Sequence, residues 1–557
     1  MTLISYSIYT IGLIFVFFSF GYTVIENYQS NDDESLENRN NNIYIESGYI
    51  VEQQYYQDIL FYDMVLELFP ESKLLSGSVV ITLTAKSDID TIVFNFYNNM
   101  NISSITSEET KIEYRREDKR IYLGKGLNAS DTLSIRIDYS GTPKKLGFAA
   151  FSFGKLNGES VTYTLNEPVY ASAWYPCNDL PNDKALMRMK IINDSGFVSV
   201  SNGVLENIDT VSNRHSYTWL TKNPISTYLI CLYSAKYEMF NDVYTSISGV
   251  DIPINYYVLK GQVEKAKKDF EDHPKMFRFM EEKFGEYPFS NEKYGVAVFL
   301  WQSGAMEHQT ITGVGSNFIS GSKFFNDLYL HELAHHWFGN SVSPKSWENI
   351  WLNEGFASYC EALYDEWAHG EAALNSTMRR KFGTFENERL GNPKNLFGSI
   401  VYDKGAWVLH MLRYEIGDEN FFAGLNIYLQ KFKHSYATIE DFVSVIETQT
   451  GRDLKFFFDQ WIFRGSGIVN ATYNFTTEKS GKDEFVINLK VEQVQNSVKE
   501  YIFNLEILVK GKGGETALIP VRIDKRVSEY KLKINFTPVE VKLDPQGKLL
   551  ANFVKKK

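Results

Sequence analysis

The segment His331-Glu-Leu-Ala-His335 constrains this chain more than any other feature of its sequence, because it matches the pattern HExxH. Apolar residues recur at helical spacing from 324 to 338, which predicts a helix there. Residues i and i+4 of a helix lie on one face, so both imidazoles can bind one metal ion. Glu332 between them can then take a proton from a water molecule on that ion. Taken alone, the segment also fits a surface helix with incidental histidines.

A catalytic zinc ion has three protein ligands and one open position. Glu354, within Trp351-Leu-Asn-Glu-Gly-Phe-Ala357, is the candidate for the third ligand. Eighteen residues separate it from His335, which is enough for a loop and the start of a returning helix. The alternative for Glu354 is an ordinary carboxylate at a helix N-terminus, favoured by the helix dipole. Together these residues predict one Zn2+ per chain, and two histidines with one glutamate also suit cobalt or manganese.

Glu361 lies seven residues after Glu354 and therefore on the same face of the predicted helix. We predict that it accepts a hydrogen bond from one of the ligand histidines. A solvated or capping carboxylate explains the same position nearly as well. His336 directly follows His335 and should point away from the metal, so we predict a structural role for it.

The periodicity of apolar residues divides the chain into three predicted domains. From 45 to 250, short alternating runs are separated by Gly, Asn and Asp, which predicts a β-rich domain. From 251 to 464, apolar residues recur at helical spacing, as in 265–284 and 350–367, which predicts a mainly helical domain. Alternation returns from 465 to 557, a length that fits one β-sandwich. We therefore predict an α+β multidomain fold.

The first 25 residues differ from the rest of the chain. No charged side chain occurs from Thr2 to Ile25, and residues 13–20 are strongly apolar. This predicts an export signal or a membrane anchor in 1–25, followed by a flexible polar linker in 26–44. No Lys or Arg precedes the apolar core, and a buried first helix is the alternative. We accordingly expect an exported protein: periplasmic, extracellular, or anchored to a membrane and facing outward.

Charge and cysteine content narrow the class of partner. The formal net charge is −12 and no long basic run occurs, which argues against nucleic acid as a partner. The cysteines lack CxxC spacing, so neither a zinc ribbon nor a disulfide framework is predicted. They are Cys177, Cys231 and Cys360.

Beyond the metal motif, the sequence resembles the aminopeptidase N family of zinc metallopeptidases, in a short form without the family's large C-terminal helical domain. The likeness rests on four separated blocks: His331-Glu-Leu-Ala-His335 with Asn353-Glu-Gly-Phe-Ala357, Gly304-Ala-Met-Glu307, Tyr402-Asp-Lys-Gly405, and Asn166-Glu-Pro-Val-Tyr-Ala171 with Trp174-Tyr-Pro-Cys-Asn-Asp179. The resemblance implies a β-rich N-terminal domain, a thermolysin-like catalytic domain and a C-terminal β-sandwich.

The resemblance also implies roles for individual residues. Glu307 and Glu167 match positions that bind the N-terminal amine of a substrate, since a carboxylate fixed near the zinc can pair with a free ammonium group. Tyr402 matches the tyrosine that stabilises the tetrahedral oxyanion. The family position after Glu307 is commonly Asn, whereas this chain has His308. The strand that pairs with the substrate backbone matches Gly304, Ala305 and Met306.

These patterns together predict a zinc-dependent aminopeptidase that acts on peptides with a free N-terminus. One alternative is an endopeptidase with the same metal chemistry, against which Glu307 argues. A second alternative is an exported binding protein on an inactive peptidase scaffold. The complete set of metal ligands, base and tyrosine argues against this second alternative.

Overall fold

The computed structural model describes residues 48–211, 213–386 and 388–556. The predicted signal or anchor in 1–25 and the linker in 26–44 lie outside these residues. Among the residues that the structure does describe, no helix is long and apolar enough to cross a membrane. The three cysteines are free and buried.

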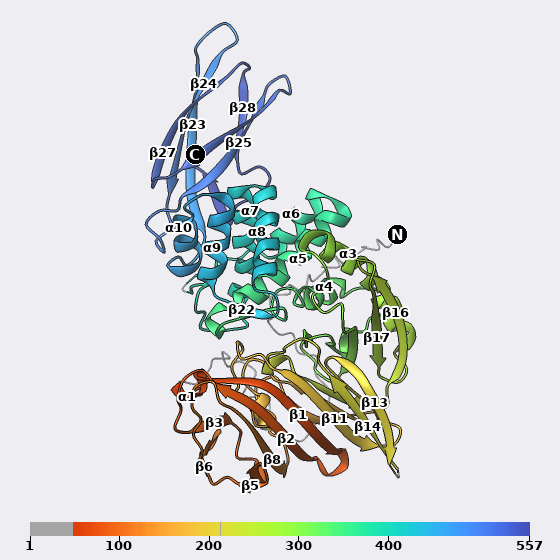
Figure 1. Ribbon diagram of the computed structural model, residues 1–557. Helices are drawn as coiled ribbons and strands as arrows, with labels where there is room; N and C mark the ends of the chain where they lie inside the picture. Colours follow the sequence, from red (N-terminus) through yellow and green to blue (C-terminus); the bar gives the residue numbers. More distant parts are fainter. Residues whose placement is uncertain (1–47, 212, 387, 557) are drawn as a thin grey trace, which may run out of the picture. The chain divides into compact units, whose positions relative to one another are not determined.

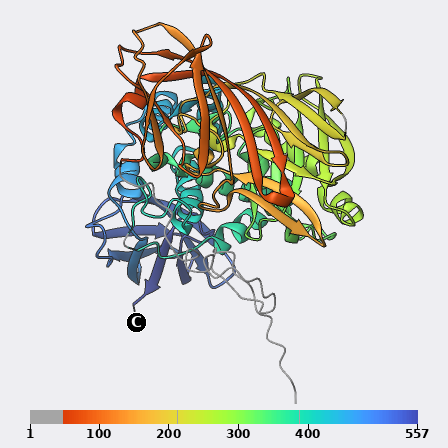
Figure 2. The same cartoon turned by 90° about the horizontal axis from the view of Figure 1, so that it is seen from below.

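An eight-stranded sheet makes up much of the N-terminal part of the chain, and its strands, coloured red to yellow, lie side by side in Figures 1 and 2. Alternation explains why these segments are strands: from Leu75 to Ala85, every second side chain is buried and the others are partly exposed. In spatial order the strands are β13 (Val204–Val211), β14 (Arg214–Leu220), β11 (Leu186–Asp194), β1 (Gln57–Phe69), β2 (Leu74–Ala85), β8 (Thr132–Gly141), β4 (Met100–Ser107) and β5 (Thr110–Lys111).

Two smaller sheets and several short helices complete this part of the chain. One sheet has the order β12 (Val198–Ser201), β15 (Leu232–Ala235), β10 (Glu159–Leu165) and β9 (Ala150–Leu156). The other has the order β3 (Ile92–Asn95), β7 (Arg120–Leu123) and β6 (Tyr114–Arg116). The short helices are α1 (Glu52–Tyr55), η2 (Pro70–Ser72), η3 (Ala171–Ala173) and η4 (Thr227–Leu229). β10 leads directly into Glu167, so the first of these sheets carries one predicted site residue.

The central part combines a five-stranded sheet with helices. The sheet has the order β16 (Glu238–Thr245), β17 (Asp251–Val258), β18 (Tyr294–Phe299), β20 (Thr312–Gly315) and β19 (Ala305–Met306), so β19 is an edge strand. The helices are α2 (Val263–Phe270), α3 (His273–Phe284), η5 (Ser316–Phe318), α4 (Asn326–Ala334), η6 (Trp347–Asn349), α5 (Trp351–His369), α6 (Glu371–Arg380), η7 (Ile400–Lys404), α7 (Gly405–Ile416), α8 (Asp418–Lys431), α9 (Ile439–Thr450), α10 (Lys455–Phe458) and η8 (Asp459–Phe463). Strands β21 (Val342–Pro344) and β22 (Ser435–Ala437) pair in parallel beside them.

The C-terminal part, blue in Figure 1, consists of two sheets. One has the order β27 (Val527–Ile534), β24 (Phe485–Gln493), β23 (Val469–Lys479) and β29 (Ala551–Lys555). The other has the order β26 (Thr516–Ile523), β25 (Phe503–Gly511) and β28 (Pro538–Leu543). Alternate side chains of both sheets are buried, as in a β-sandwich. The predicted α+β multidomain fold class is confirmed.

Candidate metal and active site

Helix α4 brings the two histidines of the HExxH pattern onto one side. His331 lies in its last turn and His335 caps its C-terminal end, and their ring centroids are 4.7 Å apart. Both side chains are almost completely buried. The spacing of four residues therefore places the two imidazoles side by side, as the sequence predicted.

Helix α5 supplies the third candidate ligand from its first turn. Glu354 Oε2 lies 3.3 Å from His331 Nε2 and 3.4 Å from His335 Nε2. Ligand atoms on a tetrahedral zinc ion with bonds of about 2.0–2.1 Å are separated by roughly 3.3–3.4 Å. The two distances from the carboxylate oxygen to the histidine nitrogens thus match those of a zinc site, and all three donor atoms lie within 4.8 Å of one another.

The outer nitrogen atoms of both histidines face oxygen acceptors. His331 Nδ1 lies 2.8 Å from Glu361 Oε1, and His335 Nδ1 lies 3.1 Å from the carbonyl oxygen of Phe338. Each contact holds the tautomer in which Nδ1 carries the proton and Nε2 presents its lone pair to a metal. Lys381 Nζ donates to the other oxygen of Glu361 at 2.7 Å, so this buried carboxylate has a cationic partner.

Glu332 lies between the two ligand histidines and is 4% exposed. Burial raises its pKa to about 8, chiefly because the charged form loses hydration. Among the described residues, its Oε2 atom has no hydrogen-bond partner. A carboxyl group with a pKa near neutrality can both accept and return a proton.

A second group of acidic side chains adjoins the metal ligands. Oxygen atoms of Glu167, Glu307 and Glu354 lie within 4.8 Å of one another. Burial, together with the nearby carboxylates, raises the pKa of Glu167 and of Glu307. Carboxylates at this separation repel one another unless a proton or a bound cation neutralises them. The group is therefore suited to bind a cation beside the metal ion.

Strand β19 leads directly into Glu307 and lies at the free edge of its sheet. It pairs only with β20, through Ala305 with Val314 and Met306 with Gly313. Its other edge can pair with an extended peptide. Gly304 precedes this strand with φ of 159°, close to extended backbone. The structure thus places Ala305 and Met306 of the predicted substrate-pairing segment on an edge strand.

Tyr402 reaches the metal ligands from the π-helical segment η7. Its ring stacks on that of His331, with centroids 5.8 Å apart and an interplanar angle of 19°. Close approach of two helices permits this, because a Cβ atom on Gly355 would lie 2.9 Å from the Cα of Gly405. Burial raises the pKa of Tyr402 well above its usual range, so the phenol keeps its proton and can donate it in a hydrogen bond.

His308 occupies the position where the family commonly has Asn. It is fully buried, and its Nδ1 lies 2.6 Å from the hydroxyl of Tyr233 in β15. Burial lowers the pKa of His308 to about 3, so the ring is neutral. The histidine therefore anchors the end of the edge strand to the N-terminal part of the chain.

Sequence reasoning identified the site residues that have a recognisable spacing and missed three that support them. Lys381 and Tyr233 contact Glu361 and His308, and Asn340 donates from Nδ2 to the carbonyl oxygen of Glu307 at 2.7 Å. Asn340 lies five residues after His335, just beyond the HExxH pattern. This short distance along the chain was the one feature of the sequence that could have pointed to a role for Asn340 at the site.

Two protein-family models match the chain. The model described as the peptidase family M1 domain matches residues 268–461, which include the candidate metal ligands and Tyr402. The model described as the peptidase M1 N-terminal domain matches residues 59–229, which include Glu167.

Curated relatives are aminopeptidases. Mitochondrial aminopeptidase 2 of Saccharomyces cerevisiae is 26% identical over 496 residues, which cover 82% of this chain and 51% of the relative. Probable aminopeptidase 2 of Sulfurisphaera tokodaii is 25% identical over 475 residues, which cover 80% of this chain and 58% of the relative. The chain spans little more than half the length of these relatives.

Solved structures show the same fold. An M1 zinc metallopeptidase from Deinococcus radiodurans is 24% identical, with a TM-score of 0.63 over 73% of this chain and 93% of that chain. Aminopeptidase A of Legionella pneumophila, in complex with aspartic acid, is 19% identical, with a TM-score of 0.79 over 90% of this chain and 60% of that chain.

Proposed function

The chain belongs to peptidase family M1, and from this premise we propose that it is a zinc aminopeptidase that removes residues from the N-terminus of peptides. The observation that carries the proposal is the pair Glu167 and Glu307, which lies beside the candidate metal ligand Glu354. A metal site alone would support any zinc hydrolase. A cation-binding group next to it selects substrates whose reacting bond lies one residue from a positive charge.

His331, His335 and Glu354 would hold the zinc ion through two nitrogen atoms and one carboxylate oxygen. When bound, zinc supplies Lewis acidity, which polarises the peptide carbonyl and makes water a stronger acid. Glu361 and the carbonyl of Phe338 keep the two imidazoles oriented for this task.

Glu332 takes the proton from the attacking water and delivers it to the leaving amine. Its buried position beside both histidines suits this role. Tyr402 donates its phenolic hydrogen to the oxyanion that develops on the former carbonyl oxygen. Its ring lies against that of His331, so the hydroxyl comes from the same side of the site as the metal ligands.

Glu307 and Glu167 pair with the ammonium group of the substrate, which is charged near neutral pH. The substrate backbone pairs with the edge strand β19, which ends immediately before Glu307. These two contacts set the scissile bond one residue from the amine. An endopeptidase has no use for a buried carboxylate pair that requires a cation, so the geometry favours the exopeptidase.

The proposal is tested with two peptides of one sequence, one with a free and one with an acetylated N-terminus. We expect hydrolysis of the free peptide only, its loss with a chelator and its return on adding Zn2+. Equal cleavage of both peptides would support the endopeptidase instead. Absence of cleavage with one zinc ion bound per chain would support the inactive binding protein.

We further propose that the chain is exported, on the basis of the uncharged, apolar residues before Glu26. Cell fractionation of the full chain and of a version lacking residues 2–25 tests this. The full chain is expected outside the cytoplasm and the shortened one inside it. The same distribution for both chains would contradict the proposal.

A further inference from the structure

Residues 307–310, here called the 307–310 segment, join the edge strand β19 to β20. The segment is held at both ends by residues that follow the metal ligand His335 in the chain. Asn340 Nδ2 donates to the carbonyl oxygen of Glu307 at 2.7 Å. His336 Nε2 accepts from the backbone N–H of Thr310 at 3.1 Å. The peptide that carries Glu307 is thus tied to the peptide that carries a metal ligand.

Asn340 connects the two sites over a short path. Its own backbone N–H donates to the carbonyl oxygen of His335 at 2.9 Å, and its side chain is fully buried. One residue therefore bonds both to the backbone of a metal ligand and to the backbone of Glu307. A displacement of either backbone would break one of these two hydrogen bonds.

The carboxylate of Glu307 depends on this backbone anchor. Among the described residues, its Oε1 atom has no hydrogen-bond partner, so no side-chain contact fixes that oxygen. Strand β19 has two residues and only one neighbouring strand, so the sheet holds it weakly. The hydrogen bond from Asn340 to the carbonyl of Glu307 therefore helps to set the position of this side chain.

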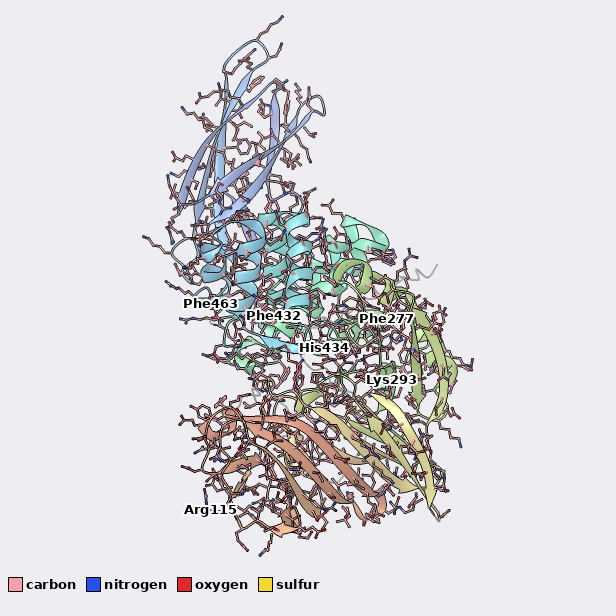
Figure 3. The ribbon with its side chains drawn as sticks, in the orientation of Figure 1. Arg115, Phe277, Lys293, Phe432, His434 and Phe463 are labelled. Carbon is pink, nitrogen blue, oxygen red and sulfur yellow. The ribbon has the colours of Figure 1, made fainter. Side chains whose placement is uncertain are left out.

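The far end of the segment also needs support. Thr310 has φ of 64°, a left-handed conformation that is unfavourable for a non-glycine residue. Lys293, labelled in Figure 3, donates to its carbonyl oxygen at 3.1 Å, while His336 accepts from its N–H. The position of Asn340 is fixed in turn from the N-terminal part of the chain, because Lys184 Nζ donates to its carbonyl oxygen at 2.7 Å.

We infer that Asn340 is a positioning residue that sets the distance between the metal ligands and Glu307, and so determines how well a free N-terminus is recognised. The inference rests on the proposed function of Glu307. Asn340 is not one of the candidate metal ligands, and its side chain donates to a backbone carbonyl. It acts through two backbone carbonyls, those of His335 and Glu307. Because the turn that follows α4 carries it, amine recognition and metal binding share one rigid support.

The test compares Asn340→Ala with a control at another buried asparagine, Asn193→Ala. Asn193 is 1% exposed, and its side-chain amide donates to Ser234 Oγ on β15 rather than to a backbone carbonyl of the 307–310 segment. Zinc content, KM and kcat for the free peptide, and the ratio of free to acetylated peptide hydrolysis are measured. Calorimetry of L-leucine binding to the zinc-loaded protein measures amine recognition without turnover. Asn340→Ser is the second variant in case the alanine variant does not fold.

For Asn340→Ala we expect KM and the Kd of L-leucine to rise about tenfold or more, because a buried carbonyl loses its donor and the carboxylate shifts. One zinc ion per chain should remain bound, and the control should match the wild type. Unchanged KM and leucine binding would overturn the inference. A second result would also overturn the inference: the variant loses part of its zinc, and the chains that still hold zinc bind leucine as the wild type does. If the wild type does not hydrolyse peptides, the proposed function fails. The comparison of leucine binding between the variant and the wild type then tests the inference by itself.

Discussion

Glu332 is the residue on which the proposed reaction depends most directly. Replacing it with glutamine keeps the size of the side chain and both ligand histidines but removes the ability to accept a proton. We expect Glu332→Gln to retain one zinc ion per chain and to lose at least about a hundredfold in kcat. Metal analysis and steady-state kinetics on the same sample check this. A variant with wild-type kcat would exclude Glu332 as the base.

Tyr402 makes a different prediction, because its hydroxyl acts on the oxyanion rather than on the water. Tyr402→Phe keeps the ring that stacks on His331 and removes only the donor. We expect kcat to fall on the order of a hundredfold or more while KM stays within about twofold. Kinetics with one free peptide measure both constants. A rise in KM without a change in kcat would show that the hydroxyl binds substrate and does not stabilise the transition state.

The sequence predicted His331 and His335 as candidate metal ligands and Glu332 as the candidate base, because their spacing follows from helix geometry. Glu361 was predicted for the same reason, and its Oε1 lies 2.8 Å from His331 Nδ1. Asn340 was not predicted, since its partner is a backbone carbonyl 33 residues earlier in the chain. Every residue offers such a carbonyl, so no side-chain pattern marks the acceptor.

At the scale of elements, a stretch with continuous helical spacing forms two helices. Apolar spacing from 265 to 284 predicted helical structure, which the structure divides into α2, ending at Phe270, and α3, beginning at His273. Pro274 explains the break: it has no N–H, and its ring would collide with the carbonyl of Phe270 in a continuous helix. Periodicity alone did not reveal the break because the apolar face continues through it.

Asp269, near the end of α2, holds the loop that leads into α4, the helix that carries His331. Asp269 is fully buried, and its carboxylate accepts the backbone N–H groups of Ser320, Gly321, Ser322 and Lys323 at 2.6–2.9 Å. We expect Asp269→Ala to lower the free energy of unfolding by about 3 kcal/mol, because these donors lose a charged acceptor. Urea denaturation of the zinc-loaded protein measures the change.

Glu264→Gln is the control for this prediction, because Glu264 lies on the same helix and its side chain is 86% exposed. It should change the free energy of unfolding by no more than about 0.5 kcal/mol. Equal effects of the two substitutions would show that the cap on residues 320–323 contributes little stability.

At the scale of the whole molecule, contacts between distant segments complete both the site and the fold. Glu167 and Lys184 reach the site from the N-terminal part, where the sequence shows only β-strand alternation. On the other side, Glu415 of α7 accepts from Arg452 and from Arg522 of β26, which ties the C-terminal sheets to the helices. Alternation predicted that these sheets exist, but it carries no information on where they dock, because docking depends on single charged residues.

Asp183 makes a prediction for the stability of the whole molecule. It is 4% exposed, and burial raises its pKa to about 7, although Asn178 and the N–H of Ile59 donate to it. The unfolded chain releases this proton near pH 4 and the folded chain near pH 7. The folded state therefore binds more protons between these values, and the contribution of Asp183 to stability is present below pH 4 and lost as the pH rises to 7. The loss amounts to about 4 kcal/mol across this window.

Asp183→Asn removes the group that titrates. As the pH rises from 5 to 7, the variant should therefore gain unfolding free energy relative to the wild type by roughly 1 kcal/mol per pH unit. Urea denaturation at pH 5, 6, 7 and 8 with fixed free Zn2+ measures this difference, in which the pH dependence of metal binding cancels. A constant loss from poorer hydrogen bonding to Asn178 would displace the curve without changing its slope. Parallel curves for variant and wild type would show that Asp183 is ionised in the folded protein, and the buried network around it would then have to stabilise a negative charge.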